Sequence, residues 1–493
     1  MYYMSTRNKN IKVAPSRAIL DGIAEDGGLY VPEEFPQFLR SDIRDLIEKS
    51  YPERLATVLS RYLTDFDFEE LLEYAEAAGD KFDGDACPLL KVEDDIYILE
   101  LFHGPTSAFK DMALSVMPYL VSAAKRKNND DNKTLILVAT SGDTGKAALE
   151  GFRDMEGIEI MTFYPNEGVS GIQKAQMTTT EGDNVYVAAV RGNFDDAQTA
   201  VKNIFCDKEL CDRLEKKGMK LSSANSINIG RLIPQIAYYF SAYADLLGSG
   251  EIKSGEKINI VVPTGNFGNI LAAYYAQKSG LPVNKLICAS NRNNILTDFF
   301  DTGEYDTNRS FYKTSSPSMD ILVSSNLERF LFDISKEDDA MIRELMSDLK
   351  ANGKYSVSNA ILARCAEFVA AGYADEEDVK TTVCNFYESC GYVLDTHTAV
   401  GVSVYYDYLN NVNEDAKAVI VATASPYKFA ADVYYYLSEF KVSDSFLAIK
   451  KLNSYTGLDI PEGLQDLDLR EQRFSDIIKK DDIAAKIAER YGL

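Results

Sequence analysis

The sequence predicts an α/β protein with two parallel-sheet domains that follow a mainly helical N-terminal region. Residues 1–95 are acidic and mostly follow the spacing of amphipathic helices. From about residue 96 onward, short apolar runs alternate with helical stretches, and glycine-containing loops join several of them. The order strand, glycine loop, helix is typical of right-handed parallel α/β units, and it occurs here in two successive series.

The N-terminal region, residues 1–95, contains one clear amphipathic helix and one short strand. Residues 64–79, TDFDFEELLEYAEAAG, place apolar side chains three and four residues apart. Residues 24–33, AEDGGLYVPE, carry a Gly-Gly turn that leads into an apolar strand.

The two series of strands define the rest of the predicted organisation. We expect a smaller α/β domain at residues 96–225 and a larger one at 226–440, with a loop-rich and then helical insertion near 301–374. A charged helical tail follows at residues 441–493. The expected strands lie at residues 96–101, 135–140, 158–164 and 185–190, and then at 258–263, 286–291 and 418–423.

The net charge limits the possible partners. The chain has 76 acidic and 52 basic residues, which gives a net charge of −24. Such a charge disfavours binding to nucleic acid or to an anionic membrane through bulk electrostatics. An anionic small molecule therefore needs a local positive pocket.

The cysteine and histidine content disfavours a metal site. Seven cysteines occur without a CxxC pair, and the only histidines are His103 and His397. The N-terminus, MYYMSTRNKN, lacks an apolar signal core, and no run approaches 18 apolar residues. These features predict reduced thiols and a cytoplasmic protein that does not enter a membrane.

Lys110 is the residue that points most strongly to catalysis. It follows a Gly-Pro turn, and apolar side chains recur on one helix face from Phe109 to Val121. Lys110 is therefore expected in the first turn of a buried helix, where the helix dipole and burial both disfavour a protonated amine. A neutral lysine can form a Schiff base or act as a general base. An isolated lysine at a helix start is more often a solvated surface residue, so Lys110 alone does not identify a site.

Three further segments come directly after predicted strands. TSGDTG, residues 140–145, offers backbone N–H groups and hydroxyls to a carboxylate or phosphate, although the same residues are also common helix caps. TGNFGN, residues 264–269, is neither a Walker loop nor a GxGxxG fingerprint, so it suits a single phosphate or is a simple glycine turn. Thr423 places a hydroxyl at the end of the last strand, and Lys428 places a cation nearby.

Together these features match the requirements of pyridoxal 5′-phosphate. This cofactor needs a lysine for its aldehyde, an anion site for its phosphate and a partner for its ring nitrogen. The carboxyl ends of parallel strands open on one crevice, so we expect the cofactor in the crevice between the two domains.

Several ordered sequence blocks resemble the threonine synthase family, within the tryptophan-synthase-β-like group of pyridoxal-phosphate enzymes. The block HGPTSAFKD is similar to the segment that holds the family's Schiff-base lysine, which corresponds to Lys110. The other blocks are STR at residues 5–7, GIAEDGGLYVPE at 22–33, NSIN with a following Arg at 225–231, PTGNFGN at 263–269, PSMDI at 317–321, SNLERF at 325–330 and DTHTAVG at 395–401.

The resemblance implies roles for individual residues. Lys110 would form the Schiff base, and Thr423 would bind the pyridine nitrogen. Asp143 stands where related lyases and sulfhydrylases carry an asparagine beside the cofactor's O3′. The cofactor phosphate would be held by Gly265, Asn266, Phe267, Gly268 and Asn269. The substrate would be bound by Thr140, Ser141, Thr144, Asn225, Ser226, Asn228, Arg231 and Lys428.

Two positions depart from the family pattern. Ile229 stands where the family often has an aromatic residue, and Ser425 stands where it usually has histidine. Neither departure removes a cofactor ligand. His103 either orients the leaving group or a proton, or is structural, and His397 is expected to be structural.

The resemblance implies conversion of O-phospho-L-homoserine and water to L-threonine and phosphate. Lys110 would remove the α-proton, and Arg231 or Lys428 would bind the leaving phosphate. The alternatives are another pyridoxal-phosphate lyase, such as a serine or threonine dehydratase, and a catalytically silent binding protein. A small-molecule substrate, no metal and a monomer or homodimer are expected.

Overall fold

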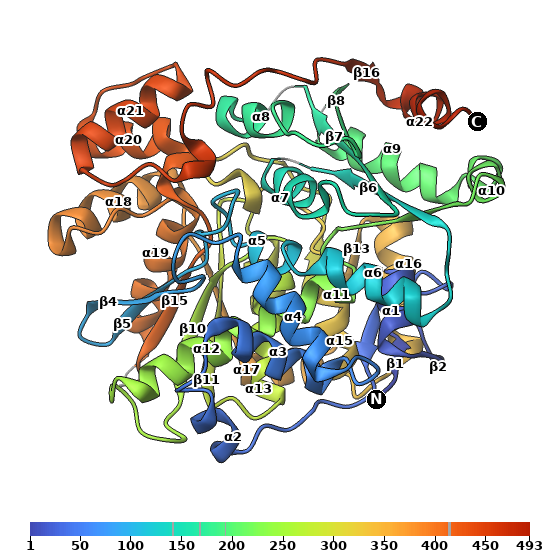
Figure 1. The fold of residues 1–493 in the computed structure, drawn as a ribbon. Coiled ribbons are helices and arrows are strands. Elements are labelled where there is room, and N and C mark those ends of the chain that lie inside the picture. The colour runs from blue at the N-terminus through green and yellow to red at the C-terminus, as the bar shows by residue number, and fades with distance from the viewer. Residues whose placement is uncertain (141, 167–168, 193, 413–415) are drawn as a thin grey trace.

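The fold class predicted from the sequence is confirmed. The computed structural model describes residues 1–493 except 141, 167–168, 193 and 413–415. Over these residues, two largely parallel sheets face each other across a crevice, and a mainly helical N-terminal region packs beside them (Figure 1). Among the described residues, no helix combines the length and apolar character that a bilayer span requires.

The N-terminal region begins with a small antiparallel sheet of strand order β2-β1-β3. Strand β3 is the strand expected in residues 24–33, and α4 is the expected amphipathic helix. The elements are β1 (Tyr3–Ser5), β2 (Asn8–Val13), α1 (Pro15–Asp21), β3 (Tyr30–Pro32), α2 (Arg40–Asp45), α3 (Tyr51–Tyr62) and α4 (Phe68–Gly79).

The first of the two large sheets, which we call the small sheet, is fully parallel in its described strands, with the order β16-β8-β7-β6-β9. Its strands are β6 (Lys133–Ala139), β7 (Ile158–Pro165), β8 (Val185–Arg191), β9 (Met219–Ser222) and β16 (Ile477–Lys479). The accompanying helices are α5 (Asp111–Leu114), α6 (Met117–Lys127), α7 (Asp143–Phe152), α8 (Gly171–Thr178), α9 (Phe194–Cys206) and α10 (Lys208–Lys216).

The second sheet, the large sheet, has the order β14-β11-β10-β15-β5-β4 over the described residues, and only β4 runs antiparallel. Its strands are β4 (Leu89–Glu93), β5 (Ile96–Glu100), β10 (Ile258–Pro263), β11 (Val283–Ser290), β14 (Val369–Tyr373) and β15 (Ala418–Ala422). Its helices are α11 (Ile229–Leu232), α12 (Pro234–Gly248), α13 (Gly268–Lys278), α14 (Ile295–Thr302), α18 (Glu376–Cys390), α19 (Thr396–Asn411), η2 (Pro426–Phe429), α20 (Ala430–Ser438) and α21 (Ser445–Thr456).

The remaining elements belong to the insertion and the tail. In the insertion, β12 pairs with β13 in a separate antiparallel ribbon. These elements are β12 (Glu304–Asp306), η1 (Pro317–Met319), α15 (Leu327–Ile334), α16 (Asp339–Asn352), β13 (Lys354–Ser356), α17 (Asn359–Phe368), η3 (Glu462–Leu464), η4 (Lys480–Asp482) and α22 (Ile483–Tyr491).

Three strands lie in sheets that the chain order did not predict. Strand β5 pairs with β15 of the large sheet, although residues 96–225 were assigned to the smaller domain. Strand β14 ends the insertion and joins the edge of the large sheet, and β16 brings the tail back to the small sheet (Figure 1). Sheet partners are set by tertiary contacts, so the domain limits of the sequence analysis do not follow the sheets. Those limits stay a prediction.

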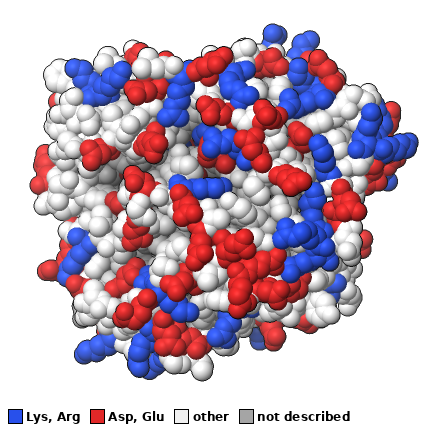
Figure 2. Space-filling view, in the orientation of Figure 1, with Lys and Arg blue, Asp and Glu red and all other residues white. Residues whose placement is uncertain are grey.

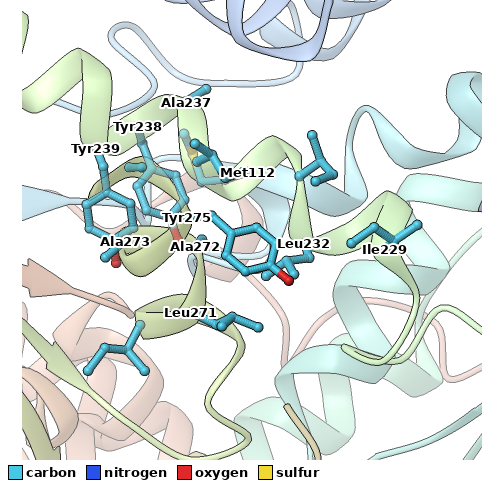
Figure 3. Packing of buried hydrophobic residues seen from close by; sticks show 14 of the residues in the cluster. Met112, Ile229, Leu232, Ala237, Tyr238, Tyr239, Leu271, Ala272, Ala273 and Tyr275 are labelled. Carbon is cyan, nitrogen blue, oxygen red and sulfur yellow. The ribbon is translucent and has the colours of Figure 1, made fainter. Parts of the chain in front are cut away.

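A core of tyrosines supports the loop after β10. Helix α12 lays Tyr238 and Tyr239 over the start of α13, with Tyr275 and Met112 nearby (Figure 3). The Tyr238 and Tyr239 hydroxyls both donate hydrogen bonds to the side-chain oxygen of Asn269, the second residue of α13. Since buried polar groups require partners, this core fixes both the position and the amide orientation of Asn269.

Gly151 brings α7 close to α5, and its replacement tests that packing. A β-carbon at Gly151 would lie 2.1 Å from the backbone oxygen of Leu114, which cannot move without shifting α5. We expect Gly151→Ala to cost about 1–3 kcal/mol, as for other over-packed cores. Differential scanning calorimetry should show a lower melting temperature. As a control, Gly79→Ala meets only the side chain of Pro52, at 3.1 Å, and should melt within a degree or two of the wild type. Equal melting of the two variants would contradict this packing.

Candidate active site

The predicted loops converge on one cavity between the large and small sheets. The segments that follow β5, β6, β10 and β15 all contribute to its walls, as expected for the carboxyl ends of parallel strands. The sequence-predicted residues that line it are Lys110, Thr140, Asp143, Thr144, Asn225, Ser226, Arg231, Gly265, Asn266, Phe267, Gly268, Asn269 and Thr423. Ser141 lies outside the described residues.

Lys110 is buried at the start of α5. Its backbone is helical, and it precedes a four-residue helix rather than the longer helix predicted from Phe109 to Val121. The side chain is 8% exposed, and the ammonium lies 4.9 Å from the centre of the Phe109 ring. Burial lowers the pKa of Lys110. The charges of Arg231 and Lys428 lower this pKa further, and the charge of Asp143 raises it. The expectation of a lysine with a depressed pKa in a helical first turn therefore agrees with the geometry.

Asp143, the first residue of α7, is the centre of the polar network. Its Oδ2 accepts hydrogen bonds from Lys110 Nζ at 3.3 Å and from Ser318 Oγ at 2.9 Å. Its Oδ1 accepts from Gln173 Nε2 and lies 2.9 Å from Lys428 Nζ. Burial alone would raise the pKa of this carboxyl, but Lys428 and Lys110 outweigh burial and hold the pKa well below its usual range.

Lys428 does not line the cavity, in contrast to the other predicted cations, and its predicted role in substrate binding is not supported by its position. Its side chain is fully buried in η2, and Nζ donates to the backbone oxygen of Thr106 at 2.8 Å in addition to its ion pair with Asp143. Its charge is therefore already compensated inside the protein. Sequence spacing carried no information about this burial.

The loop after β6 is organised by Thr140. Its hydroxyl oxygen accepts hydrogen bonds from the N–H groups of Gly142 and Gly145, each at 2.9 Å. Gly142 has a φ of 148°, and a β-carbon there would collide with Gln173 at 2.4 Å. Thr140 thus caps the loop and also lines the cavity, and the binding of a carboxylate or phosphate by this segment stays a prediction.

The loop after β10 forms a tight cradle at the start of α13. Phe267 adopts a left-handed conformation with φ of 60°, and its ring packs against Phe300 and Phe330. The backbone oxygen of Asn266 accepts hydrogen bonds from Asn326, and that of Gly265 accepts from Ser324. A β-carbon at Gly265 would lie 2.9 Å from the backbone oxygen of Ser318. These contacts hold a strained loop in one shape.

Asn269 leaves a buried donor without a partner among the described residues. Its side-chain oxygen accepts hydrogen bonds from Tyr238 and Tyr239, whereas its Nδ2 group is buried and has no protein acceptor; the residue itself lines the cavity. An unsatisfied buried N–H group costs about 1–3 kcal/mol, which a bound acceptor removes. Together with the N-terminus of the eleven-residue helix α13, this donor favours an anion in the cradle.

Arg231 is a buried cation in the cavity wall. Its guanidinium donates to the backbone oxygen of Ala224 at 3.0 Å, and in the described part of the chain it has no carboxylate partner within 4 Å. Burial lowers its pKa to about 10. Asn228, three residues earlier, does not line the cavity. Its amide nitrogen donates to the backbone oxygens of Ile19 and Ser223 and its amide oxygen caps α11, so its position does not support the predicted role in substrate binding.

Thr423 lies at the end of β15 and also fixes the lysine segment. Its backbone oxygen accepts a hydrogen bond from the N–H of Phe109 at 2.9 Å, and its side chain lines the cavity. The segment that carries Lys110 and the strand end that carries Thr423 are thus joined by a backbone hydrogen bond.

The two histidines lie in different places. His397 lines the cavity, but its Nε2 accepts a hydrogen bond from Ser318 N–H at 3.1 Å and its Nδ1 lies 3.1 Å from Asp395, in agreement with a structural role. His103 lies outside this cavity and pairs with Glu100 at 2.7 Å, which favours the structural alternative, and a role in orienting the leaving group stays untested. Among the described residues, no group of three or more His, Cys, Asp or Glu side chains is arranged to hold a metal ion.

Gln173 and Ser318 were not identified from the sequence as site residues. Both bind Asp143, yet they come from α8 and η1, far from α7 along the chain. Ser318 lies in the PSMDI block, which was the only available signal.

Comparisons with known proteins agree with this geometry. Three family models match: threonine synthase N terminus at residues 2–78, pyridoxal-phosphate dependent enzyme at 87–424 and threonine synthase, C-terminal, at 398–487. The chain is 39% identical to human threonine synthase-like 1 over 460 residues, which are 90% of this chain and 61% of that protein. The chain thus spans about three-fifths of the length of threonine synthase-like 1.

Two further relatives match over nearly their full length. Threonine synthase of Pseudomonas aeruginosa is 37% identical over 479 residues, covering 96% of this chain and 95% of that protein. The crystal structure of pyridoxal-phosphate-bound threonine synthase from Brucella melitensis superposes with a TM-score of 0.88 at 36% identity, covering 100% of this chain and 99% of the other. The chain therefore belongs to the threonine synthase family of pyridoxal-phosphate-dependent enzymes.

Proposed function

We propose that this protein is a threonine synthase, which converts O-phospho-L-homoserine and water to L-threonine and phosphate with pyridoxal 5′-phosphate as cofactor. The observation that carries the proposal is the convergence of Lys110, the cradle at residues 265–269, Thr423 and the uncompensated Arg231 on one cavity. A cytoplasmic location and a monomeric or homodimeric state, expected from the sequence, are part of this proposal.

The residues present fit the cofactor. The unpaired Nδ2 group of Asn269 and the N–H groups of Gly268 and Asn269 at the start of α13 suit its phosphate. Lys110 is buried and has a depressed pKa, as reaction with the cofactor's aldehyde requires. The Thr423 hydroxyl suits the cofactor's ring nitrogen. When bound, the cofactor supplies an electron sink for carbanion chemistry at the substrate's α-carbon.

The chain's own residues then account for proton transfer and binding. Lys110, when neutral, would take the proton from Cα of the substrate and return one later in the reaction. Asp143 stays ionised beside it, so it can accept hydrogen bonds but does not compete as an acid. Thr140, Thr144 and the N–H groups at the start of α7 would hold the substrate carboxylate, and Ser141 stays a prediction there.

Arg231 favours a phosphorylated substrate over serine or threonine. A buried guanidinium without a carboxylate is stabilised by an anion that enters its cavity. Lys428 cannot serve in this way because Asp143 already neutralises it. We therefore assign the phosphate of O-phospho-L-homoserine to Arg231, with Asn225 and Ser226 on the neighbouring wall.

Replacement of Lys110 tests the proposed activity. Lys110→Ala, supplied with cofactor, should lose phosphate release from O-phospho-L-homoserine by about 100-fold or more, because the proton-transfer group is gone. Phosphate and L-threonine should appear in equal amounts from the wild type. Equal activity in both proteins would end the assignment, and ammonia with a keto acid formed from threonine would instead identify a dehydratase.

Asp143 and Lys428 should move the pKa of Lys110 in opposite directions. Asp143→Asn removes a carboxylate that raises this pKa, and Lys428→Met removes an ammonium that lowers it. The rate at which cofactor-free protein takes up added pyridoxal phosphate rises with pH as Lys110 becomes neutral. We expect the pH midpoint of this rate to fall in Asp143→Asn and to rise in Lys428→Met, each by about one pH unit or more. A general loss of structure would not give opposite signs, and shifts in one direction would contradict the network.

Arg231 should control substrate affinity in protein that is saturated with the cofactor. Arg231→Gln should raise the KM for O-phospho-L-homoserine about tenfold or more, since charge-assisted hydrogen bonds to the phosphate are lost. Arg231→Lys keeps the charge and should recover part of the affinity. The absorbance of the bound cofactor serves as the control and should be the same in all three proteins. An unchanged KM in Arg231→Gln would remove Arg231 from the substrate site.

A further inference from the structure

A second cavity, of about 970 Å³, opens beside the later turns of α7. Its walls come from the segment after α4, the segment before Lys110, the end of α8 and the tail at residues 458–473. In the described structure it shares no lining residue with the cavity of Lys110. Figure 2 shows a hollow on this face, with lysine and arginine side chains near its margin. The volume lies within the range of small-molecule sites.

Four cations gather at one end of this cavity, which we call the basic corner: Lys81, Lys146, Arg153 and Arg470. Glu150 is the carboxylate among them, and it pairs with Lys146 at 2.9 Å and with Arg153 at 3.0 Å. Lys146 is held rigidly, since its side chain is 10% exposed and Nζ also donates to Thr180 Oγ1 at 3.2 Å. Glu150 thus pairs with two of the corner's four cations. The whole cavity wall has a fifth cation, Arg473, which donates to the backbone oxygens of Thr180 and Gly182, and eight carboxylates.

Lys81 and Arg470 have no ion-pair partner within 4 Å among the described residues. Arg470 is held in place by hydrogen bonds to the backbone oxygens of Glu462 and Gln465, which leave its charge uncompensated. Lys81 is half-buried, and burial lowers its pKa. Burial lowers the pKa of Lys146, Glu150 opposes burial, and Arg153 and Arg470 lower this pKa further.

Among the described residues, no carboxylate of the cavity wall lies within 4 Å of Lys81 or Arg470. Glu100 is bound by His103 at 2.7 Å and by Tyr392 at 2.6 Å. The carboxylates that raise the pKa of Lys81 are Glu150 and Asp111, and Glu150 alone does so for Lys146. The other acidic residues in the cavity wall are Asp80, Asp83, Glu181, Asp459, Glu462 and Glu471.

We propose that the basic corner is a second ligand site, which binds a small anion that bears a phosphate group or paired carboxylates. Lys146 and Arg153 already share Glu150, whereas Lys81 and Arg470 have no carboxylate within 4 Å among the described residues, so an anion that enters the cavity would pair with them. Lysine and arginine donors that are already positioned form strong charge-assisted hydrogen bonds to such an anion. The site is separate from the proposed active site and does not depend on the reaction assigned to it.

Inorganic phosphate is the probe that tests the site. We expect isothermal titration calorimetry on the cofactor-loaded protein at low ionic strength to detect two phosphate sites. The double variant Lys81→Gln/Arg470→Gln should weaken one of them about tenfold or more and leave the KM for O-phospho-L-homoserine unchanged. Arg231→Gln should remove the other. Lys450→Gln, an exposed tail lysine outside the cavity, is the matched control and should bind like the wild type.

Two outcomes would overturn the proposal. One is a phosphate isotherm of the double variant that equals that of the wild type. The other is loss of all phosphate binding in Arg231→Gln, which would place every bound phosphate in the active-site cavity. Failure to release phosphate from O-phospho-L-homoserine would contradict the proposed function and leave this binding measurement readable, so the two failures are distinguishable.

Discussion

The buried carboxylate of Asp143 is the group on which the arrangement of the site depends. A carboxylate in this position is strongly disfavoured unless several donors surround it, and four side chains do so here. Asp143 and Gln173 belong to elements of the small sheet, whereas Lys110, Ser318 and Lys428 follow strands or loops of the large sheet. The network therefore joins the two sheets across the crevice. Loss of one partner of a buried ion pair typically costs about 3–5 kcal/mol, so the ion pairs of Asp143 with Lys110 and Lys428 also hold the two sheets together.

The network around Asp143 also affects the pKa of Lys110. Its ammonium shares Asp143 with Lys428, and the two cations compete for one negative charge. Because Lys428 lies closer to the carboxylate, at 2.9 Å against 3.3 Å, it takes the larger share of the compensation. Burial lowers the pKa of Lys110, Asp143 opposes burial, and Arg231 and Lys428 lower this pKa further. The same fold that buries the lysine thus provides a fixed charge that helps to keep it reactive.

Much of the fold could be predicted because the strands are buried on both faces. Side chains of β10 alternate between two cores, Ile260 and Val262 in one and Val261 in the other, and such strands appear as continuous apolar runs. Strand β16 could not be predicted, since Ile477–Lys479 is short and its pairing with β8 depends on the path of the whole tail. The break between α5 and α6 was missed for a related reason. The apolar face continues across Ser115 and Val116, and periodicity does not detect a change of helix axis.

The site shows the same limit at the level of single side chains. The loops that begin at Thr140 and Thr264 could be predicted to meet because strand order and strand direction imply it. Lys428 and Arg231 could not be told apart from the sequence, because both are cations close to strand ends. What separates them is their partners: Lys428 faces a carboxylate and a backbone oxygen, whereas Arg231 faces a backbone oxygen and the cavity. A cation that is already paired gains little from a new anion, and a buried unpaired one gains much. We therefore propose that Arg231, and not Lys428, binds the phosphate group of the substrate.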